Sequence, residues 1–313
     1  MRIGIMGAGA IGNYCAALLT AAGHEVILFA RGKTLEAIQE KGIILSTPDI
    51  AAHIYHVEVA AAADAANYTD IDIVLLATKV LPNAEAFPEL PKGAAVVTIQ
   101  NSVEAPYLAA EKYGEELILP GTFRGFLTNL GPGQVHLHDP SVALNFGTFK
   151  PGPNKLDPLC AEFSAALNSV NISTQVLADP WPDVWAKALF VTPLGALGAA
   201  ARRPLGYVRT TLRDSYISVL SEVAAVARAH QVSLSSGLIE KQLAFADSLP
   251  EENTTSMHRD ILLGQANELD AQVGAIIRMG EKVQVRTPLL RLLLGILTAT
   301  AADAAMSARV NHN

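Results

Sequence analysis

The sequence has few cysteines, few charged residues and no excess of basic ones, and each shortage excludes a class of protein. Its two cysteines, Cys15 and Cys160, are far apart and outside any metal-ligand spacing, so we expect buried thiols of a reducing compartment. A net charge of −7 over 313 residues, with no basic patch, argues against nucleic-acid binding. Only 17% of the residues are charged and 50% are hydrophobic, which indicates a compact globular enzyme and not a disordered chain.

Signals for export or membrane insertion are also missing from the sequence. The N-terminus is already typical of a strand and a glycine loop, so we expect no secretory signal. The most apolar late run, around Leu289–Leu297, contains Arg291 and is too short to span a bilayer. We therefore expect a soluble cytoplasmic protein with no membrane partner, and its length favours two domains.

The most informative stretch is the N-terminal sequence MRIGIMGAGAIG. Residues 2–6 predict a short apolar strand, and an Ala-rich helix follows to about Ala22. The glycines between them have G-x-G-x-x-G spacing, and a second strand, HEVILFA, comes next, which is the context of a dinucleotide-binding turn. The residues expected to bind the pyrophosphate of a coenzyme are Gly7, Gly9, Ala10, Ile11 and Gly12.

Each glycine of this turn has its own physical reason. Gly7 permits a tight turn, Gly9 lets backbone amides approach a pyrophosphate, and Gly12 lets the helix pack close to the strand. The alternative is a strand–helix turn with incidental glycines.

The end of the second strand carries a base where an NAD site carries an acid. NAD-binding sites have Asp or Glu about 20 residues after the glycines, where the carboxylate bonds the ribose hydroxyls. Here Arg31 stands at the strand end with Lys33 close behind. A guanidinium pairs well with a 2′-phosphate, so NADP(H) is favoured as coenzyme. The alternative is an ordinary solvated arginine at a strand–loop junction.

Later apolar runs predict the remaining parallel strands. These runs cover residues 71–79, 93–102 and 116–123, and continuous apolar sequence is typical of strands buried on both faces. Ligands of open α/β sheets bind at the carboxyl ends of the strands, so Lys79, Gln100 and Asn101 are expected at the coenzyme edge. Asn101 could instead cap a helix beginning at Val103.

The other segments complete the predicted architecture. Extended chain, with an inserted hairpin as one option, is expected over 43–59, antiparallel strands over 124–149, helices over 34–41 and 157–169, and a strand near 172–177. After the proline-bearing segment 178–183 the pattern becomes helical, including residues 257–280 and 288–306. In this helical part His230 is expected to be packed and Glu222 to be solvated.

We therefore predict an α/β fold with two domains. An N-terminal Rossmann-type, NADP-binding domain covers residues 1–179, and an all-α substrate and catalytic domain covers residues 180–313. His136 and His138 alternate on a presumed strand without further ligands at metal spacing, so no metal site is expected. The apolar helices after residue 205 could bury one another or a partner subunit in a homodimer, and periodicity does not distinguish the two.

With these motifs in order, the chain resembles the ketopantoate reductase (2-dehydropantoate 2-reductase) family over nearly its whole length. The matching motifs are GAGAIG with Arg31, ATK ending at Lys79, QN at Gln100–Asn101, GPGQVHLH, WAK at Trp185–Lys187, SMHRD from Ser256, ELD at Glu268 and TP at Thr287–Pro288. The family combines a Rossmann domain with a helical domain and has its active site in the cleft between them.

The resemblance implies roles for five residues. Lys187 corresponds to the catalytic general acid, which protonates the nascent alkoxide, and Glu268 to the acid that engages substrate and helps position that lysine. Ser256 corresponds to a contact of the substrate carboxylate, Asn101 to the amide near nicotinamide and substrate, and Lys79 to the lysine at the end of the fourth strand. The implied activity is NADPH-dependent reduction of a small-molecule 2-oxo acid, most directly ketopantoate to pantoate in pantothenate biosynthesis.

Simpler roles remain open for the same residues. Lys187 could be a solvated helix lysine and Glu268 a solvated helix acid. Ser256 could cap a helix, and its spacing of 12 residues from Glu268 would put both on one face of a single helix.

The sequence also departs from the family pattern. Val191 and Gly195 stand where the family carries asparagines that bond the substrate, each hydrogen bond contributing about 1 kcal/mol net. Ser102 replaces the glycine of QNG, the glutamine that commonly follows the fourth-strand lysine is replaced in the region 81–83, and Arg202 and Arg203 add charge. Two alternatives stay open: a dehydrogenase of another ketone or an imine on the same scaffold, and a non-catalytic NADP(H) sensor.

Overall fold

The computed structural model describes residues 1–81 and 87–310, so the replacement expected in region 81–83 lies largely outside the described residues. The chain forms two compact units that divide between Pro180 and Trp181. Residues 79–81 and Asn101–Ala105 group with the second unit, although the first unit surrounds them in sequence. Each unit is described separately below.

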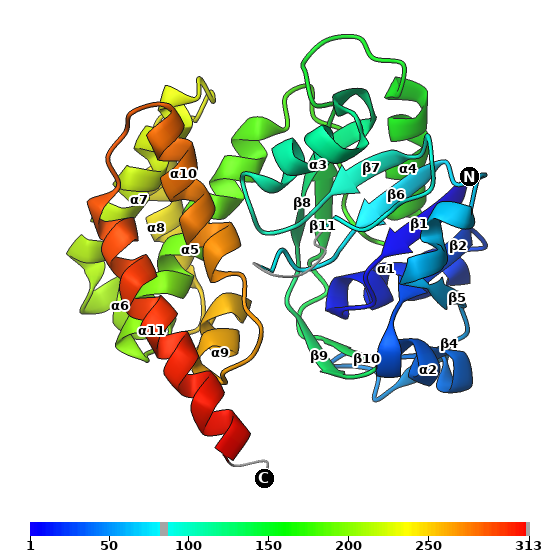
Figure 1. Cartoon of the computed structure of the whole chain (residues 1–313), viewed down its shortest axis with the longest axis horizontal. Coiled ribbons are helices and arrows are strands. Elements are labelled where there is room, and N and C mark those ends of the chain that lie inside the picture. Colours follow the sequence, from blue (N-terminus) through cyan, green and yellow to red (C-terminus); the bar gives the residue numbers. More distant parts are fainter. Residues whose placement is uncertain (82–86, 311–313) are drawn as a thin grey trace. The chain divides into compact units, whose positions relative to one another are not determined.

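The first unit is built on a seven-stranded sheet with the order β11-β8-β7-β6-β1-β2-β5 (Figure 1). All neighbouring strands run parallel except β11, which is antiparallel to β8. The strands are β1 (Arg2–Met6), β2 (Glu25–Ala30), β5 (Glu58–Ala61), β6 (Ile73–Leu76), β7 (Ala95–Thr98), β8 (Ile118–Arg124) and β11 (Ala143–Phe146). The central strands β6 and β7 are buried at every residue, which explains their unbroken apolar sequences.

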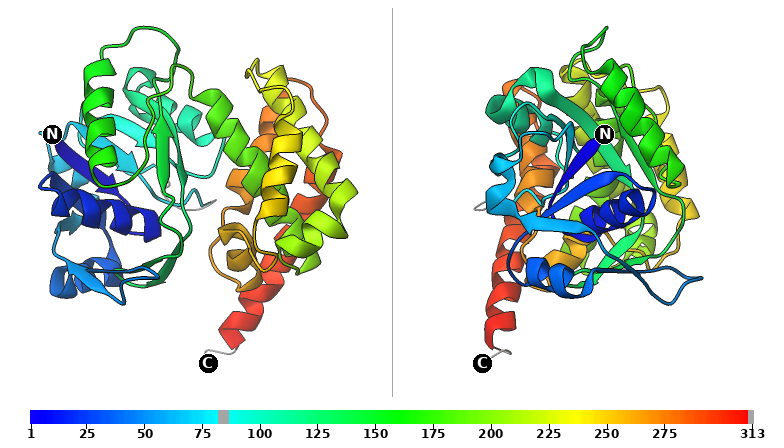
Figure 2. Two further views of the ribbon diagram at one scale, coloured as in Figure 1. Left: turned by 180° about the vertical axis from the view of Figure 1, so that it is seen from behind. Right: turned by 90° about the vertical axis from the view of Figure 1, so that its right-hand side faces the viewer.

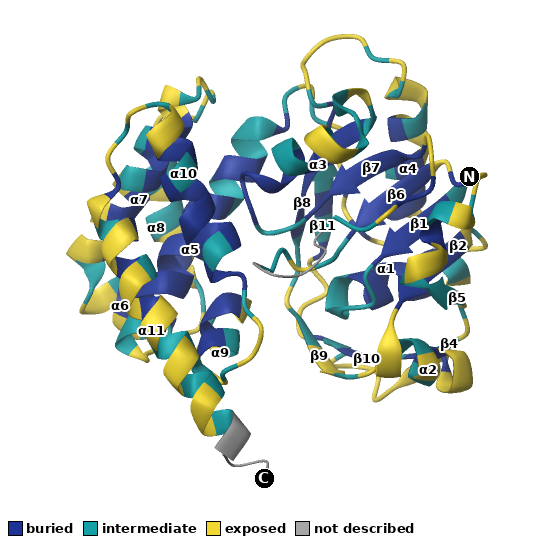
Figure 3. Cartoon of the chain, viewed as in Figure 1, coloured by how far each residue is buried: buried dark blue, intermediate teal, exposed yellow. Residues whose placement is uncertain are grey.

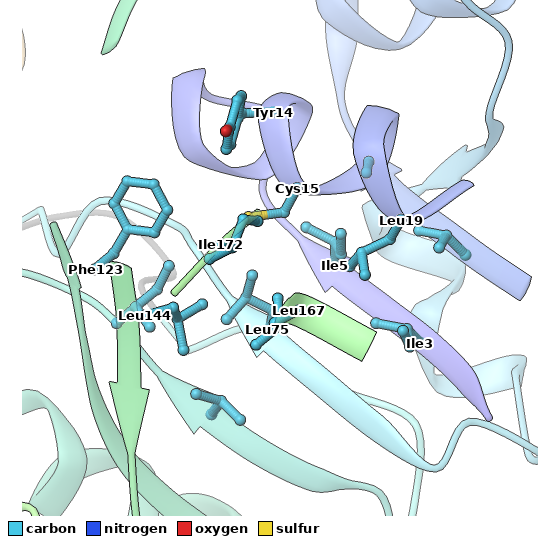
Figure 4. Close-up of a cluster of buried hydrophobic side chains, with 14 of the residues drawn as sticks. Ile3, Ile5, Tyr14, Cys15, Leu19, Leu75, Phe123, Leu144, Leu167 and Ile172 are labelled. Carbon is cyan, nitrogen blue, oxygen red and sulfur yellow. The ribbon is translucent and has the colours of Figure 1, made fainter. Parts of the chain in front are cut away.

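Helices cover both faces of this sheet. The helices are α1 (Ala10–Ala21), α2 (Gly32–Lys41), α3 (Ala105–Tyr113) and α4 (Asp157–Ser169), with short 3₁₀ turns at Ala62–Asn67 and Glu115–Leu117. Figure 4 shows Cys15 and Leu19 of α1 against Ile5 of β1, in the same apolar cluster as Leu167 of α4. Both cysteines are buried free thiols, as predicted. Because β1, β6, β7 and β8 run parallel, their carboxyl ends and the glycine loop after β1 lie at the same edge of the sheet.

A small second sheet has the order β4-β3-β10-β9. Its strands are β3 (Ile43–Ser46), β4 (His53–Tyr55), β9 (Leu127–Gly131) and β10 (Gln134–Leu137). The expected hairpin is formed by β3 and β4, while β5 leaves it to join the main sheet beside β2. The strand predicted near 172–177 is present in part: Ser173 and Val176 form isolated parallel bridges to β11, and backbone hydrogen bonds join residues 173–177 to residues 142–146.

The second unit is helical, and no strand occurs after residue 180 in the part of the chain that the structure describes. Its helices are α5 (Trp181–Ala201), α6 (Leu205–Thr210), α7 (Arg213–Ala229), α8 (Leu238–Ser248), α9 (Ser256–Leu262), α10 (Ala275–Lys282) and α11 (Pro288–Val310), with a π-helical turn, η3 (Asp270–Gly274), before α10. Figure 3 shows α5 as a mostly buried helix. The α/β fold with a helical second part is therefore confirmed.

Glu222 of α7 and His230, the residue directly after α7, illustrate how this unit packs. His230 is packed as predicted: its ring stacks on Trp185 with centroids 6.3 Å apart, and Nε2 lies 2.9 Å from the Met279 carbonyl oxygen. The solvated role expected for Glu222 is wrong, because its carboxylate accepts the N–H groups of Leu289 at 2.8 Å and Leu290 at 3.0 Å. Glu222 thus satisfies the first free amides of α11 and complements its dipole.

The helix expected over 257–280 is interrupted. Helix α9 ends at Leu262, and Gly264 has φ +64°, a left-handed conformation that ends a helix. The chain is irregular through Glu268 and becomes helical again at Leu269. The interpretation of Ser256 and Glu268 as residues of one helix face is therefore wrong.

Two helices, α5 and residues 288–308 of α11, are long and apolar enough to cross a membrane by length and composition alone. The expectation that the late apolar run is too short was wrong, because alanine-rich turns after Leu297 extend the helix. The apolar window of α5 is 67% buried, as in a core helix, whereas that of α11 is 17% buried. Figure 2 shows α11 extending past α9 at its C-terminal end.

Candidate active site

The glycine loop between β1 and α1 has the positive φ angle, the close packing and the open position that its G-x-G-x-x-G spacing predicts. Gly7 has φ +111°, and a Cβ there would lie 3.0 Å from the backbone of Ala77. A Cβ on Gly12 would overlap the Gly7 carbonyl oxygen, so α1 packs on this turn only without a side chain. A Cβ on Gly9 would meet nothing within 4 Å. Packing thus requires two of the glycines, while the third leaves the start of α1 open.

The end of β2 lies beside this loop. The N–H of Gly7 donates to the Phe29 carbonyl oxygen at 3.1 Å, which ties the loop to β2 two residues before Arg31. Arg31 and Lys33 are exposed at the start of α2, and within the described ranges neither side chain forms an ion pair or hydrogen bond. Both cations are exposed directly after β2, the strand to which the glycine loop is hydrogen-bonded.

The carboxyl ends of β6 and β7 are joined by a side chain of the first unit. The amide nitrogen of Gln100 donates to both the carbonyl oxygen and the hydroxyl of Thr78, each at 3.1 Å. The next residue, Asn101, belongs to the second unit, and its buried Oδ1 has no hydrogen-bond partner among residues 1–81 and 87–310. Asn101 therefore does not cap a helix, and α3 begins only at Ala105. A buried carbonyl oxygen without a partner is an acceptor available to a ligand's N–H.

In the second unit, residues 79 and 80 bind two acids from beyond residue 250. The ammonium of Lys79 lies 2.7 Å from Asp260 Oδ2, and the N–H of Val80 donates to Glu268 Oε1 at 3.1 Å. Lys79 also reaches the Ala266 carbonyl oxygen at 3.5 Å. Asp260 stands in the SMHRD motif but is not among the predicted site residues, because nothing in the sequence indicates that it pairs with Lys79.

Glu268 is the buried acid of this group. Glu268 is only 5% exposed, and this burial raises the pKa of its carboxyl group. The Val80 N–H and the charges of Lys79 and Lys187 act in the opposite direction, and Asp260 acts with burial. Lys187, half-buried in the second turn of α5, is thus within electrostatic reach of Glu268. The solvated role considered for Glu268 is wrong.

Ser256 does not cap α9, because a capping residue precedes the helix and Ser256 lies within it. It is the exposed first residue of α9, while the preceding Thr255 accepts the N–H of His258 at 3.2 Å. The cap is therefore Thr255, and the Ser256 hydroxyl has no partner among the described residues. The substrate contact assigned to Ser256 stays a prediction.

Val191 and Gly195 of α5, which stand where the family carries asparagines, have different surroundings. A Cβ on Gly195 would lie 2.7 Å from Thr255 Oγ1 and 2.8 Å from Met257 Cε, so an asparagine at this position would collide with the start of α9. Val191 is half-buried and one turn earlier. The loss of the asparagine at 195 is thus coupled to close packing of α5 on α9.

The chain matches the family described as Ketopantoate reductase PanE/ApbA over residues 3–151, and that family's C-terminal part over residues 179–301. It is 29% identical to the 2-dehydropantoate 2-reductase of Pyrococcus abyssi over 311 residues, which covers 96% of this chain and 98% of that one.

Solved structures show the same fold. The 2-dehydropantoate 2-reductase from Methylococcus capsulatus has a TM-score of 0.86 at 21% identity, covering 97% of this chain and 98% of that one. A D-mandelate dehydrogenase, solved with NADH and anilino(oxo)acetate, has a TM-score of 0.83 at 21% identity, covering 97% of this chain and 100% of that one.

Proposed function

Because the chain belongs to the ketopantoate reductase family, we propose that it is an NADPH-dependent reductase of a 2-oxo acid. Its first candidate reaction is the reduction of 2-dehydropantoate to pantoate, the reaction named for its relative from Pyrococcus abyssi. That activity would make it a soluble cytoplasmic enzyme of pantothenate biosynthesis.

The residues around the glycine loop fit a phosphorylated nicotinamide dinucleotide. The open space at Gly9 admits a pyrophosphate next to the first amides of α1, where the helix dipole favours negative charge. Arg31, with Lys33, supplies a cation for a 2′-phosphate. In the second unit, the buried Asn101 oxygen is, from the family resemblance, the proposed acceptor for the carboxamide N–H of the coenzyme. The D-mandelate dehydrogenase of similar fold was solved with NADH, so the fold by itself does not select the phosphorylated coenzyme, and the proposed preference for NADPH rests on Arg31.

The cluster formed by Lys187, Glu268, Lys79 and Asp260 would perform the proton chemistry. A bound NADPH supplies the hydride that reaches the carbonyl carbon. Lys187 holds the proton that passes to the carbonyl oxygen, which becomes a hydroxyl as the lysine becomes neutral. An ammonium near that oxygen also polarises the carbonyl before transfer.

Glu268 serves this chemistry from its buried position. The Val80 N–H fixes the orientation of its carboxyl group, which lies within electrostatic reach of Lys187. The exposed hydroxyl of Ser256 is the proposed contact for the substrate carboxylate. The observation that carries the proposal is the buried Glu268 carboxyl group, which is 5% exposed and accepts the Val80 N–H at 3.1 Å, next to the Lys79–Asp260 pair at 2.7 Å.

Turnover tests this proposal directly. NADPH absorbance is followed with 2-dehydropantoate and a panel of other 2-oxo acids, ketones and imines. We expect turnover of 2-dehydropantoate. Turnover of other carbonyls only would assign another substrate to the scaffold, and tight NADPH binding without any turnover would indicate a sensor.

We also propose a homodimer formed through α11. Leu292, Ile296 and Met306 are 60%, 44% and 60% exposed on this apolar helix, a pattern typical of an interface. Sedimentation of the purified chain measures its mass in solution, and a monomer at micromolar concentration would contradict this part.

A further inference from the structure

One guanidinium joins the two segments of the second unit that carry Asn101 and Glu268. Arg278 of α10 donates from Nε to Glu104 Oε2 at 3.0 Å. Its two terminal nitrogens donate to the carboxylate of Asp270, at 2.8 Å to Oδ1 and 3.1 Å to Oδ2. Glu104 lies three residues after Asn101, and Asp270 lies two residues after Glu268. The side chain of Arg278 therefore bridges two segments that carry candidate site residues. Its partner Glu104 is 174 residues away in sequence, and its partner Asp270 is 8 residues away.

The Glu104 end of this bridge is buried. The Glu104 side chain is 8% exposed, and it pairs with Arg278 at 2.8 Å and more distantly with Lys282 at 3.7 Å. The Glu104 N–H donates to the Ser102 hydroxyl at 3.2 Å, so Glu104 is held by a hydrogen bond within the turn as well as by its ion pairs to α10. Burying a carboxylate to this degree costs free energy unless a cation pairs with it. The ion pair with Arg278 therefore keeps the segment Asn101–Ala105 attached to α10.

The Asp270 end begins the π-helical turn. This turn begins two residues after Glu268, and the Gln272 N–H donates to the Glu268 carbonyl oxygen at 2.9 Å. A Cβ on Gly274 would overlap Asp270 Oδ1 and lie 3.1 Å from the Arg278 guanidinium. Gly274 thus leaves room for the Asp270–Arg278 pair along one side of the helix. Single-turn π-helices are frequent at functional sites.

We propose that Arg278 is a positioning residue of the reductase, which holds Asn101 and Glu268 in a fixed relation without contacting substrate or coenzyme. The inference rests on the proposed function. Only a planar, forked cation can donate to both carboxylates at once, whereas a lysine ammonium is a point charge that can follow one of them. Displacement of a binding group by about 1 Å can cost up to roughly 10²-fold in rate, so loss of the bridge should lower activity well beyond its effect on stability.

The test compares Arg278→Gln and Arg278→Lys with a matched control. Arg213 forms an equally bidentate pair with Asp247, at 2.6 and 2.9 Å, between α7 and α8, and it contacts none of the candidate site residues. Thermal unfolding and the kinetic constants with NADPH and the best 2-oxo acid are measured for each folded variant. We expect Arg278→Gln to lower kcat/KM by roughly 10-fold to 100-fold, Arg278→Lys to recover only part of it, and Arg213→Gln to lower stability alone.

Two further measurements keep the proposal testable if Arg278→Gln does not fold or if the wild type turns over no carbonyl compound. Gly274→Ala retains every charge but displaces Asp270, and it should reproduce the kinetic loss. Amide hydrogen exchange should rise at residues 101–104 and 268–270 in the Arg278 variants and not in Arg213→Gln. Unchanged exchange there, or wild-type kinetic constants in a destabilised Arg278→Gln, would overturn the positioning role. A wild type without turnover would instead refute the proposed reaction.

Discussion

The glycine loop and the charge cluster are built in opposite ways. All residues of the loop come from one stretch of the chain, and two of its three glycines are required by packing within that stretch. The cluster combines Lys79, Lys187, Asp260 and Glu268, which are separated by as many as 189 positions in sequence. A site made by local geometry can be recognised from spacing, whereas a site made by burial and charge depends on how distant segments pack. The predictions below test each half of this comparison.

The largest expected effect is the loss of the proton donor in the cluster. Lys187→Ala should lower kcat by roughly 10²-fold or more, the usual contribution of a general acid, while NADPH binding is retained. Steady-state kinetics and coenzyme fluorescence measure the two separately. Lys241→Ala, which removes an exposed lysine from α8, is the control. A Lys187 variant with near-normal kcat would exclude this residue from the mechanism.

The next effect concerns the phosphate preference of the loop. Arg31→Ala should weaken NADPH binding by about 10-fold or more and leave NADH binding nearly unchanged, because only NADPH has a 2′-phosphate. Dissociation constants for both coenzymes are measured by titration. Lys41→Ala, at the other end of α2, should change neither. Equal losses for the two coenzymes would refute the role of Arg31.

A smaller effect separates packing from binding within the loop. Gly12→Ala should lower the free energy of unfolding by about 1–3 kcal/mol, because its Cβ overlaps the Gly7 carbonyl oxygen. Gly9→Ala should unfold like the wild type, since its Cβ meets nothing within 4 Å, yet bind NADPH more weakly. Chemical denaturation and coenzyme titration of both variants check this contrast. Gly9→Ala with normal coenzyme affinity would mean that the open space at α1 is not the pyrophosphate site.

The smallest effect is a pH dependence of stability in the cluster. Burial raises the pKa of Glu268 above its ordinary value, so the folded state holds this proton more tightly than the unfolded state does. The resulting stability is present below the unfolded pKa and is lost as pH rises through the folded pKa. Glu268→Gln removes the titration but retains an oxygen that can accept the Val80 N–H. Its melting temperature minus that of the wild type should therefore increase as pH rises above the ordinary carboxyl range. A constant difference would show that Glu268 does not titrate in this window.

Much of the first unit could be predicted because its signals are local. Buried parallel strands are apolar without interruption, and the helix 157–169 was predicted at the residues where α4 is observed. Prediction failed where a side chain of one segment satisfies the hydrogen-bonding groups of another. Glu222 resembles any solvated helix acid until Leu289 and Leu290 supply the amides that it accepts. The break at Gly264 was missed because an apolar helical pattern continues on both sides of it.

The sequence by itself determined the glycine turn, the order of strands and helices, and the base at the end of β2. These depend on side-chain size, backbone conformation and periodicity over a few neighbouring residues. The tertiary structure alone decided that Asp260 pairs with Lys79, that Glu268 is buried near Lys187, and that Arg278 joins the segments following Asn101 and Glu268. The strength of a charge depends on its burial and on its partners, and both are set by residues far away in the chain.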